Sequence, residues 1–199
     1  MLLAVLLGCP TAFHGDSDGD VDADTDVDAD TDTDTGLTLE EDDARVRALT
    51  GLPEGQDPAA PPLLVRIDYV VDGDTFYCTP DGTSESLKVR MIGMDTPEIA
   101  HDDPAECYGN DAWAYSESQL LDHLAWLTFD EDPDDDYGRS LNYVIRDTTE
   151  AGFFNRNLVR NGYALPLTIA PDDTYQAEIQ SDADAAEAEG RGLWSACGS

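Results

Sequence analysis

Three short stretches of the chain combine carboxylates with arginines, a pairing that suits chemistry on a phosphate diester. Carboxylate oxygens are hard ligands of the kind that Ca²⁺ prefers. Guanidinium groups keep their charge and donate paired hydrogen bonds to phosphate, and a glutamate that is free of metal can act as a general base. The stretches are Asp72–Thr75, Arg90–Glu98 and Asp136–Arg139.

Strands are expected to hold these stretches at their ends. Apolar and β-branched residues alternate with polar ones in several runs that are bounded by glycine, proline and aspartate, which is typical of strands. In one of them Val89 and Met91 face one side of the strand and Arg90 faces the other. The predicted strands cover residues 64–71, 75–78, 86–92, 125–129 and 137–146.

Apolar residues at helical spacing predict three helices in the same part of the chain. Gly162 ends the second helix, and Gly190 ends the third. Five short strands with three helices favour an α+β fold built on a small Greek-key barrel. The predicted helices cover residues 110–124, 153–161 and 173–189.

The charge balance excludes a protein that coats nucleic acid in general. The 199 residues include 44 Asp and Glu but only 10 Lys and Arg, for a net charge of −34. Affinity for a phosphate backbone comes largely from clustered basic residues. From residue 64 onward the chain holds 28 acidic and 8 basic residues, a balance of −20. Two explanations reconcile this acidity with groups suited to a phosphate diester. Either salty surroundings screen the charge, or the site acts on a different substrate or binds a ligand without catalysis.

The first nine residues are apolar and end in Gly8-Cys9. Leu6 to Cys9 resembles the lipobox of a bacterial lipoprotein signal peptide. That resemblance implies a signal peptide over 1–9, a lipid on Cys9 and a protein exported to the cell envelope. Cleavage elsewhere, which would give a secreted protein, and a chance apolar start are the alternatives. No apolar run is long enough to span a bilayer, so membrane attachment would occur only through Cys9.

Residues 10–63 are expected to form a tether. Asp occupies every second position from Asp16 to Asp34, and such a segment buries little apolar surface and repels itself, so we expect a disordered acidic tail. Thr38 to Glu41 reads as a capping box before a short helix that ends near Leu49. Residues 52–62 form a linker rich in Pro and Gly, and the folded domain covers 64–199.

Residues 64–197 resemble the staphylococcal nuclease (thermonuclease) family, because six motifs occur in the family's order and at nearly its spacing. The resemblance implies a five-stranded OB-fold β-barrel with three helices. The motifs are VVDGDTF (70–76), VRMIGMDTPE (89–98), CYGNDA (107–112), DYGRSL (136–141), LVRNGYA (158–164) and GLW (192–194).

The resemblance also implies a metal site and a disulfide. Asp74 and Asp95 would be the carboxylate ligands of a Ca²⁺ ion, the backbone carbonyl of Thr96 would add an oxygen, and Asp72 would lie in the outer sphere. A disulfide between Cys107 and Cys197 is implied by exported relatives, which would leave Cys78 as a buried thiol.

The remaining implied roles concern the reaction. Glu98 would orient or deprotonate the attacking water. Arg90 and Arg139 would bind the phosphate and stabilise the five-coordinate transition state, and Tyr137 would touch a neighbouring phosphate. The expected activity is Ca²⁺-dependent hydrolysis of DNA or RNA, single strands favoured, to 3′-phosphorylated products by a monomeric enzyme.

Two departures from the family pattern keep rival functions open. Residues 131–136 are acidic where the best-known member has basic residues, and residues 165–170 lack the tyrosines that stack on a base there. A non-catalytic OB-fold binding module on the cell surface is therefore the alternative. A structural surface domain whose acidic tail buffers divalent ions is a third hypothesis.

Overall fold

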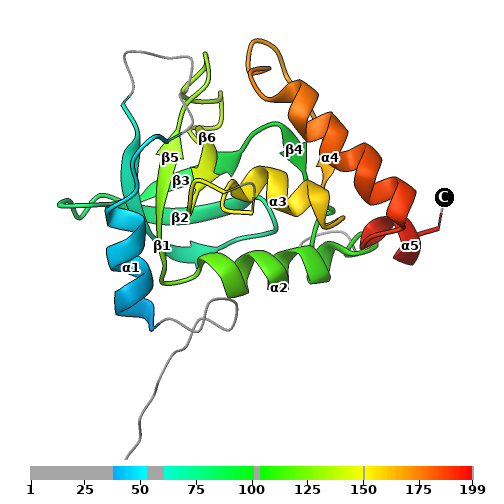
Figure 1. The fold of residues 1–199 in the computed structure, drawn as a ribbon, viewed down its shortest axis with the longest axis horizontal. Helices are drawn as coiled ribbons and strands as arrows, with labels where there is room; N and C mark the ends of the chain where they lie inside the picture. Colours follow the sequence, from blue (N-terminus) through cyan, green and yellow to red (C-terminus); the bar gives the residue numbers. More distant parts are fainter. Residues whose placement is uncertain (1–37, 53–60, 101–103, 150, 199) are drawn as a thin grey trace, which may run out of the picture.

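Five strands close into a barrel in the computed structural model, which describes residues 38–52, 61–100, 104–149 and 151–198 (Figure 1). The strand order is β1-β2-β3-β6-β5, and all neighbours are antiparallel except β3 and β6, which are parallel. The predicted OB-type α+β fold is confirmed. The strands are β1 (Leu63–Val70), β2 (Thr75–Pro80), β3 (Leu87–Met91), β5 (Leu124–Thr128) and β6 (Ser140–Ile145).

The barrel is closed around an apolar core that the strand alternation supplies. In β3, Val89 and Met91 are buried in the core, whereas Arg90 on the opposite face is only partly buried. This is the division that the sequence pattern predicts. Fully buried residues of the same core include Val65, Ile67, Phe76, Leu127 and Val144.

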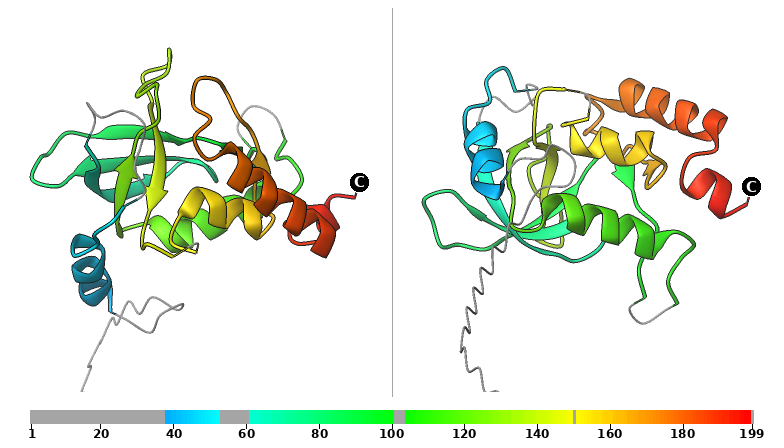
Figure 2. Two further views of the ribbon diagram at one scale, coloured as in Figure 1. Left: turned by 45° about the horizontal axis from the view of Figure 1, so that its top comes forward. Right: turned by 60° about the horizontal axis from the view of Figure 1, so that its bottom comes forward.

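The three expected helices lie beside the barrel (Figure 2): the first and second contact its strands, and the third packs on the second. The first ends earlier than predicted, because Leu121 leaves helical geometry and Leu124 belongs to β5. A two-stranded sheet of β4 (Met94–Asp95) and β7 (Leu165–Pro166), not predicted, pairs the segment after β3 with the one after α3. The helices are α2 (Gly109–Leu120), α3 (Phe154–Arg160), α4 (Gln176–Glu189) and a short α5 (Leu193–Ala196).

Buried polar groups fix α3 to its neighbours. The Asn155 side chain donates to the carbonyl of Ile92 at 2.9 Å and accepts the Val144 backbone N–H at 2.8 Å. The buried carboxylate of Asp182 in α4 accepts hydrogen bonds from Arg156 and Arg160 in α3. Arg160 therefore has a structural role in an ion pair with Asp182.

An additional helix, α1 (Leu39–Arg47), begins with the predicted capping box. The Thr38 hydroxyl accepts from the Glu41 backbone N–H at 3.3 Å, and the Glu41 carboxylate accepts from the Thr38 N–H at 3.0 Å. This helix lies on the opposite side of the barrel from α4 and α5 (Figures 1 and 2). Its Val46 packs with Leu64 and Leu124 in a small apolar cluster. The segment 38–52, assigned above to the tether, is thus packed on the barrel.

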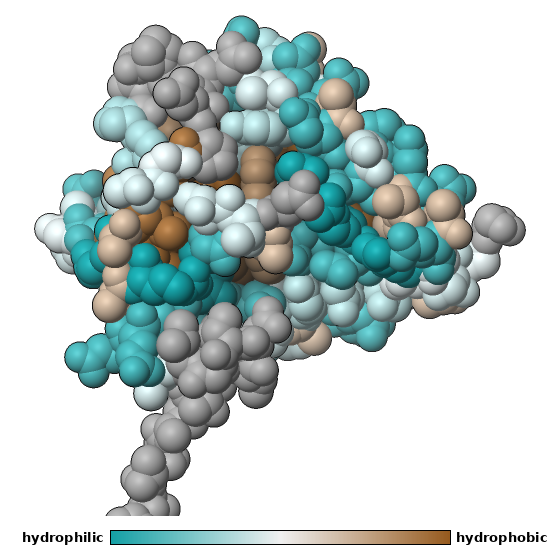
Figure 3. Space-filling model, in the orientation of Figure 1, coloured by the Kyte–Doolittle hydropathy of each residue, from teal (hydrophilic) through white to brown (hydrophobic). Residues whose placement is uncertain are grey.

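Several expectations concern parts of the chain outside the described residues. Cys9, the acidic segment up to residue 37 and most of the linker are among them. Within the described ranges, no helix combines the length and apolar character needed to cross a bilayer. The face of the molecule seen in Figure 1 is largely hydrophilic, with apolar residues showing only in small areas (Figure 3).

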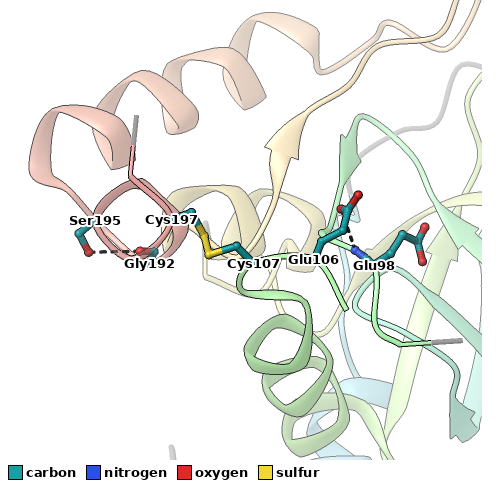
Figure 4. The surroundings of a disulfide bond; sticks show 6 residues. All are labelled: Glu98, Glu106, Cys107, Gly192, Ser195 and Cys197. Carbon is teal, nitrogen blue, oxygen red and sulfur yellow. Dashed lines mark hydrogen bonds between the residues drawn. A yellow bond between two sulfur atoms is a disulfide. The ribbon is translucent and has the colours of Figure 1, made fainter. Parts of the chain in front are cut away.

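The expected disulfide is present. Cys107, just before α2, is bonded to Cys197 at the end of α5, 90 residues later (Figure 4). Cys78 is a free thiol in the core, and burial raises its pKa to about 12. The bond therefore ties the last helix of the chain to the first turn of α2.

Removing this bond should destabilise the domain. For the double variant Cys107→Ser/Cys197→Ser we expect a loss of about 2–4 kcal/mol in unfolding free energy, because the crosslink restricts a long loop in the unfolded chain. Urea unfolding of the variant and the parent measures the difference. Cys78→Ala is the control, because it removes a cysteine that forms no disulfide. Cys78→Ser is unsuitable because it would bury a hydroxyl. Equal midpoints for the parent and the double variant would contradict the prediction.

Candidate active site

A cavity of about 570 Å³ lies where β3, the loop before β6 and residues 167–172 meet. Arg90, Glu98, Tyr137 and Arg139 all line it. Its apolar wall combines core residues with two exposed ones, Leu167 and Ile169. The others are Met91, Ile92, Met94 and Leu141. The four residues expected to act on the substrate or on the attacking water thus converge from separate stretches of the chain.

Asp74 lies beside this cavity, in the turn that leads into β2. Its side chain is 1% exposed. It accepts hydrogen bonds from the Thr75 hydroxyl at 3.0 Å, the Thr96 backbone N–H at 2.9 Å and the Thr96 hydroxyl at 3.1 Å. The turn packs closely on Thr96, since a Cβ at Gly73 would lie 2.6 Å from the Thr96 hydroxyl oxygen. The buried carboxylate is therefore held rigidly.

Arg90 joins Asp74 to Asp95 through one guanidinium. Its two terminal nitrogens form separate ion pairs, one with each carboxylate. The Asp95 side chain is 50% exposed, so one partner is buried and the other faces solvent. Two carboxylates this close repel each other unless a positive charge lies between them. The sequence placed Asp74, Asp95 and Arg90 in one site, and the structure brings them together.

The oxygens of Asp74 and Asp95, with the carbonyl of Thr96, are of the hard type that Ca²⁺ prefers. The donor set fits such an ion chemically, because the two carboxylates already share a cationic group. No group of three or more His, Cys, Asp or Glu side chains in the described ranges is arranged to hold a metal. The remaining oxygens would therefore have to come from the backbone, water or substrate.

Asp72 is buried and supports the turn. Its carboxylate accepts the Asp74 backbone N–H at 3.0 Å. It does not line the cavity. Its charge nevertheless acts on Glu98, as the pKa of that residue shows. This position agrees with the expectation that Asp72 lies in the outer sphere of the metal site.

Glu98 lines the cavity with its side chain, and its backbone is fixed from behind. Burial raises the pKa of Glu98 above its usual value, the charge of Asp72 adds to this, and Arg90 opposes it. The Glu98 N–H donates to a Glu106 carboxylate oxygen at 3.1 Å, and the Glu106 N–H donates to the Glu98 carbonyl at 2.9 Å (Figure 4). A Cβ at Gly109 would lie 2.2 Å from that carbonyl oxygen, so this position requires glycine.

Arg139 is positioned by a carboxylate that the sequence analysis did not single out. Its Nε donates to Asp135 at 2.7 Å, and the other Asp135 oxygen accepts the backbone N–H groups of Arg139 and Tyr137, each at 2.9 Å. Burial raises the pKa of Asp135, but these hydrogen bonds outweigh it and hold the pKa below its usual value. The spacing of four residues between Asp135 and Arg139 is the sequence signal that could have indicated this ion pair. Tyr137 is 85% exposed, and the Arg139 guanidinium lies 5.5 Å from its ring centre.

Replacing Asp135 should misplace Arg139 without unfolding the protein. We expect Asp135→Ala to lower kcat on a phosphodiester substrate by about tenfold, because a catalytic group that is poorly held loses orientation. Asp135→Asn should lose part of the rate, since its single amide oxygen can accept either from Nε or from the two backbone N–H groups, but not from both. Steady-state kinetics on both variants measure the effect. A rate for Asp135→Ala equal to the parent's would show that Asp135 does not position Arg139.

The cavity lining also shows the two departures from the family pattern. Carboxylates of the loop before β6 line the cavity, and Leu167 and Ile169 line it from the segment that lacks the family's tyrosines. An anionic substrate would therefore meet negative charge beside the two arginines. The exposed carboxylates of this loop that line the cavity are Asp132, Asp134 and Asp136.

Comparisons with known proteins agree with this site. A family model described as staphylococcal nuclease homologue matches residues 88–196, a range that includes Arg90, Glu98 and Arg139. A thermonuclease from Staphylococcus intermedius is 33% identical over 129 residues, covering 64% of this chain and 74% of that protein. A thermonuclease from Staphylococcus hyicus is 33% identical over 131 residues, covering 65% and 75%. The SPbeta prophage-derived endonuclease YokF from Bacillus subtilis (strain 168) is 32% identical over 136 residues, covering 66% and 44%.

Proposed function

Because the chain belongs to the family of staphylococcal nuclease homologues, we propose that it is a Ca²⁺-dependent nuclease that hydrolyses DNA or RNA to 3′-phosphorylated products. The observation that carries the proposal is that Arg90, Glu98 and Arg139 line one cavity. Two arginines and a free carboxylate at the same opening are the groups that hydrolysis of a phosphodiester requires.

The chain's own residues can carry the reaction. Arg90 and Arg139 bind the scissile phosphate and offset the charge that grows on its oxygens. Glu98 takes a proton from a water that attacks phosphorus in line with the leaving oxygen. The bond to the 5′ oxygen breaks while Arg139 donates a hydrogen bond to that oxygen, which takes a proton from solvent to become a hydroxyl, and the phosphate stays on the 3′ side. A Ca²⁺ ion held by Asp74, Asp95 and the Thr96 carbonyl would polarise the phosphoryl group.

Purified full-length chain incubated with single-stranded DNA tests the proposal. We expect cutting with Ca²⁺ and none with EDTA. Cutting should be faster at high salt, because salt screens the repulsion between the acidic surface and a polyanion. At 1 M salt this repulsion acts over only about 3 Å. Product ends are assigned by whether a phosphatase or a kinase can modify them. Inertness under every condition would reject the nuclease and leave the binding module and the structural surface domain.

One observation favours the binding module as the second candidate. Every arginine of the site is already paired with a carboxylate, Arg90 with Asp74 and Asp95, and Arg139 with Asp135. If these pairs persist with substrate present, the arginines cannot offset charge in a transition state. Binding of DNA without Ca²⁺-dependent cutting would support this candidate.

The proposed location is the cell envelope, with a lipid on Cys9 and a monomeric catalytic domain. The disulfide Cys107–Cys197 supports export, since such bonds persist in oxidising compartments. Mass spectrometry of the mature N-terminus should find diacylglycerol on Cys9. An unmodified chain that begins at another residue would reject the anchor and leave secretion.

A further inference from the structure

The outer face of β1, β2 and β3 carries a row of three side chains that the reaction does not use: Tyr69, Tyr77 and Lys88. Tyr69 is the cross-strand partner of Tyr77, and Tyr77 is the partner of Lys88. The tyrosines are 58% and 36% exposed, with ring centres 6.5 Å apart. The Lys88 ammonium lies 5.6 Å from the centre of the Tyr77 ring.

A β-bulge produces this row. The pairing of β1 with β2 shifts between Ile67 and Tyr69, and bulges of this type re-aim the side chains beside them. Asp68, which the bulge displaces, accepts a hydrogen bond from the Thr79 hydroxyl at 2.7 Å. The carboxylate of Asp68 in β1 is thus hydrogen-bonded to Thr79, and Tyr69 lies beside Tyr77.

Lys88 differs from the other basic residues. All nine arginines form ion pairs with carboxylates, whereas Lys88, in the described part of the chain, forms none. On a protein with a net charge of −34, this positive charge has no ion-pair partner among the described residues. The row therefore combines two exposed rings with an available cation.

The row continues directly into the candidate active site. The next cross-strand pair on the same face of β2 and β3 is Thr75 with Arg90. Lys88 and Arg90 are two residues apart, so they share a face at a separation of about 6.6 Å along the strand. Since Arg90 lines the cavity, a ligand held there can extend along the row.

We propose that Tyr69, Tyr77 and Lys88 form an accessory binding surface for single-stranded nucleic acid, which we call the tyrosine row. Exposed rings beside a basic residue suit unpaired bases, because bases stack on aromatic side chains without sequence preference while the cation attracts the backbone. A duplex hides its base faces and cannot stack in this way. The proposal rests on the proposed function, since it assigns where the strand flanking the scissile phosphate lies.

Binding is measured on the full chain carrying Glu98→Gln, with a fluorescent single-stranded oligothymidylate and the matching duplex as probes. In this background, Tyr69→Thr/Tyr77→Thr should raise Kd for the single strand by about tenfold and leave Kd for the duplex unchanged. Tyr69→Phe/Tyr77→Phe is the matched control and should keep the parent's Kd, because it keeps the rings. Lys88→Gln should reduce the slope of log Kd against log salt by about 0.7. Circular dichroism verifies that each variant is folded.

Catalysis separates this proposal from the proposed function. With Glu98 intact, the double Thr variant should lose about tenfold in kcat/KM on long single-stranded DNA and nothing on bis(4-nitrophenyl) phosphate, which is too small to reach the row. If the parent cuts and the Thr variant binds and cuts the single strand equally well, the tyrosine row is rejected and the nuclease stands. If the parent binds but never cuts, and the Thr variant loses binding, the row stands and the nuclease is rejected. A parent that dimerises in sedimentation, with a monomeric Thr variant, would assign the row to self-association and overturn the proposal.

Discussion

Replacing Glu98 with Gln is expected to lower kcat on single-stranded DNA by about 10²- to 10⁴-fold, the usual contribution of a general base. Gln keeps the size and shape of the side chain but cannot take a proton from water. Because Glu98 lines the cavity with both arginines, the loss should appear in the chemical step and not in substrate binding. Single-turnover cleavage with enzyme in excess measures this step directly.

Glu106→Gln is the matched control for this prediction. Glu106 lies next to Glu98, and its carboxylate accepts the Glu98 backbone N–H, a hydrogen bond that a Gln oxygen can also accept. The same substitution is therefore made at two glutamates that are in contact. Glu98 lines the cavity, and Glu106 holds the backbone of Glu98. We expect Glu106→Gln to cut at nearly the parent's rate. A Glu98→Gln variant that retains a tenth of the parent's rate or more would exclude Glu98 as the base.

Replacing Asp42 with Ala is expected to cost about 3–5 kcal/mol of unfolding free energy, because it leaves buried positive charge without a partner. Asp42 lies in α1 and is fully buried. It accepts from Arg45 at 2.6 Å, forms an ion pair with the buried Arg146, and lies 3.1 Å from His123 Nδ1. Urea unfolding measures the loss.

The same cluster predicts how the loss depends on pH. Burial raises the pKa of Asp42, but Arg45, Arg146 and His123 outweigh it and hold the pKa below its usual value. A carboxyl with a lowered folded pKa adds stability above its unfolded pKa of about 4 and loses it as the pH falls through the folded value. The difference between parent and Asp42→Ala should therefore stay constant from neutral pH to about pH 4 and close below it.

Asp43→Ala is the control for Asp42→Ala. Asp43 occupies the next position of α1, pairs with Arg66 and accepts the Leu124 backbone N–H. The Arg66 side chain is 41% exposed, so water can solvate its charge when Asp43 is lost, whereas Arg146 is buried. Asp43→Ala should therefore cost less than Asp42→Ala. Equal losses for the two variants would mean that the helix as a whole, and not the buried carboxylate, holds α1 on the barrel.

The sequence by itself determined the elements whose causes are local. Alternation marked the barrel strands, because a strand with one buried face must repeat every two residues. The capping box at Thr38 marked the start of α1, because its hydrogen bonds join residues three positions apart. Motif order predicted which side chains gather around the cavity, with Arg90, Glu98 and Arg139 among them.

Only the tertiary structure decided the features that depend on partners far apart in the chain. Residues 38–52 read as part of a tether, yet Asp42 meets Arg146, 104 residues away, and this contact packs α1 on the barrel. His123, 81 residues from Asp42, lies in the same cluster. The pairing of β4 with β7 has two residues per strand, too few to leave a pattern. The tyrosine row likewise depends on strand register and a bulge, which set side by side residues that no local pattern relates.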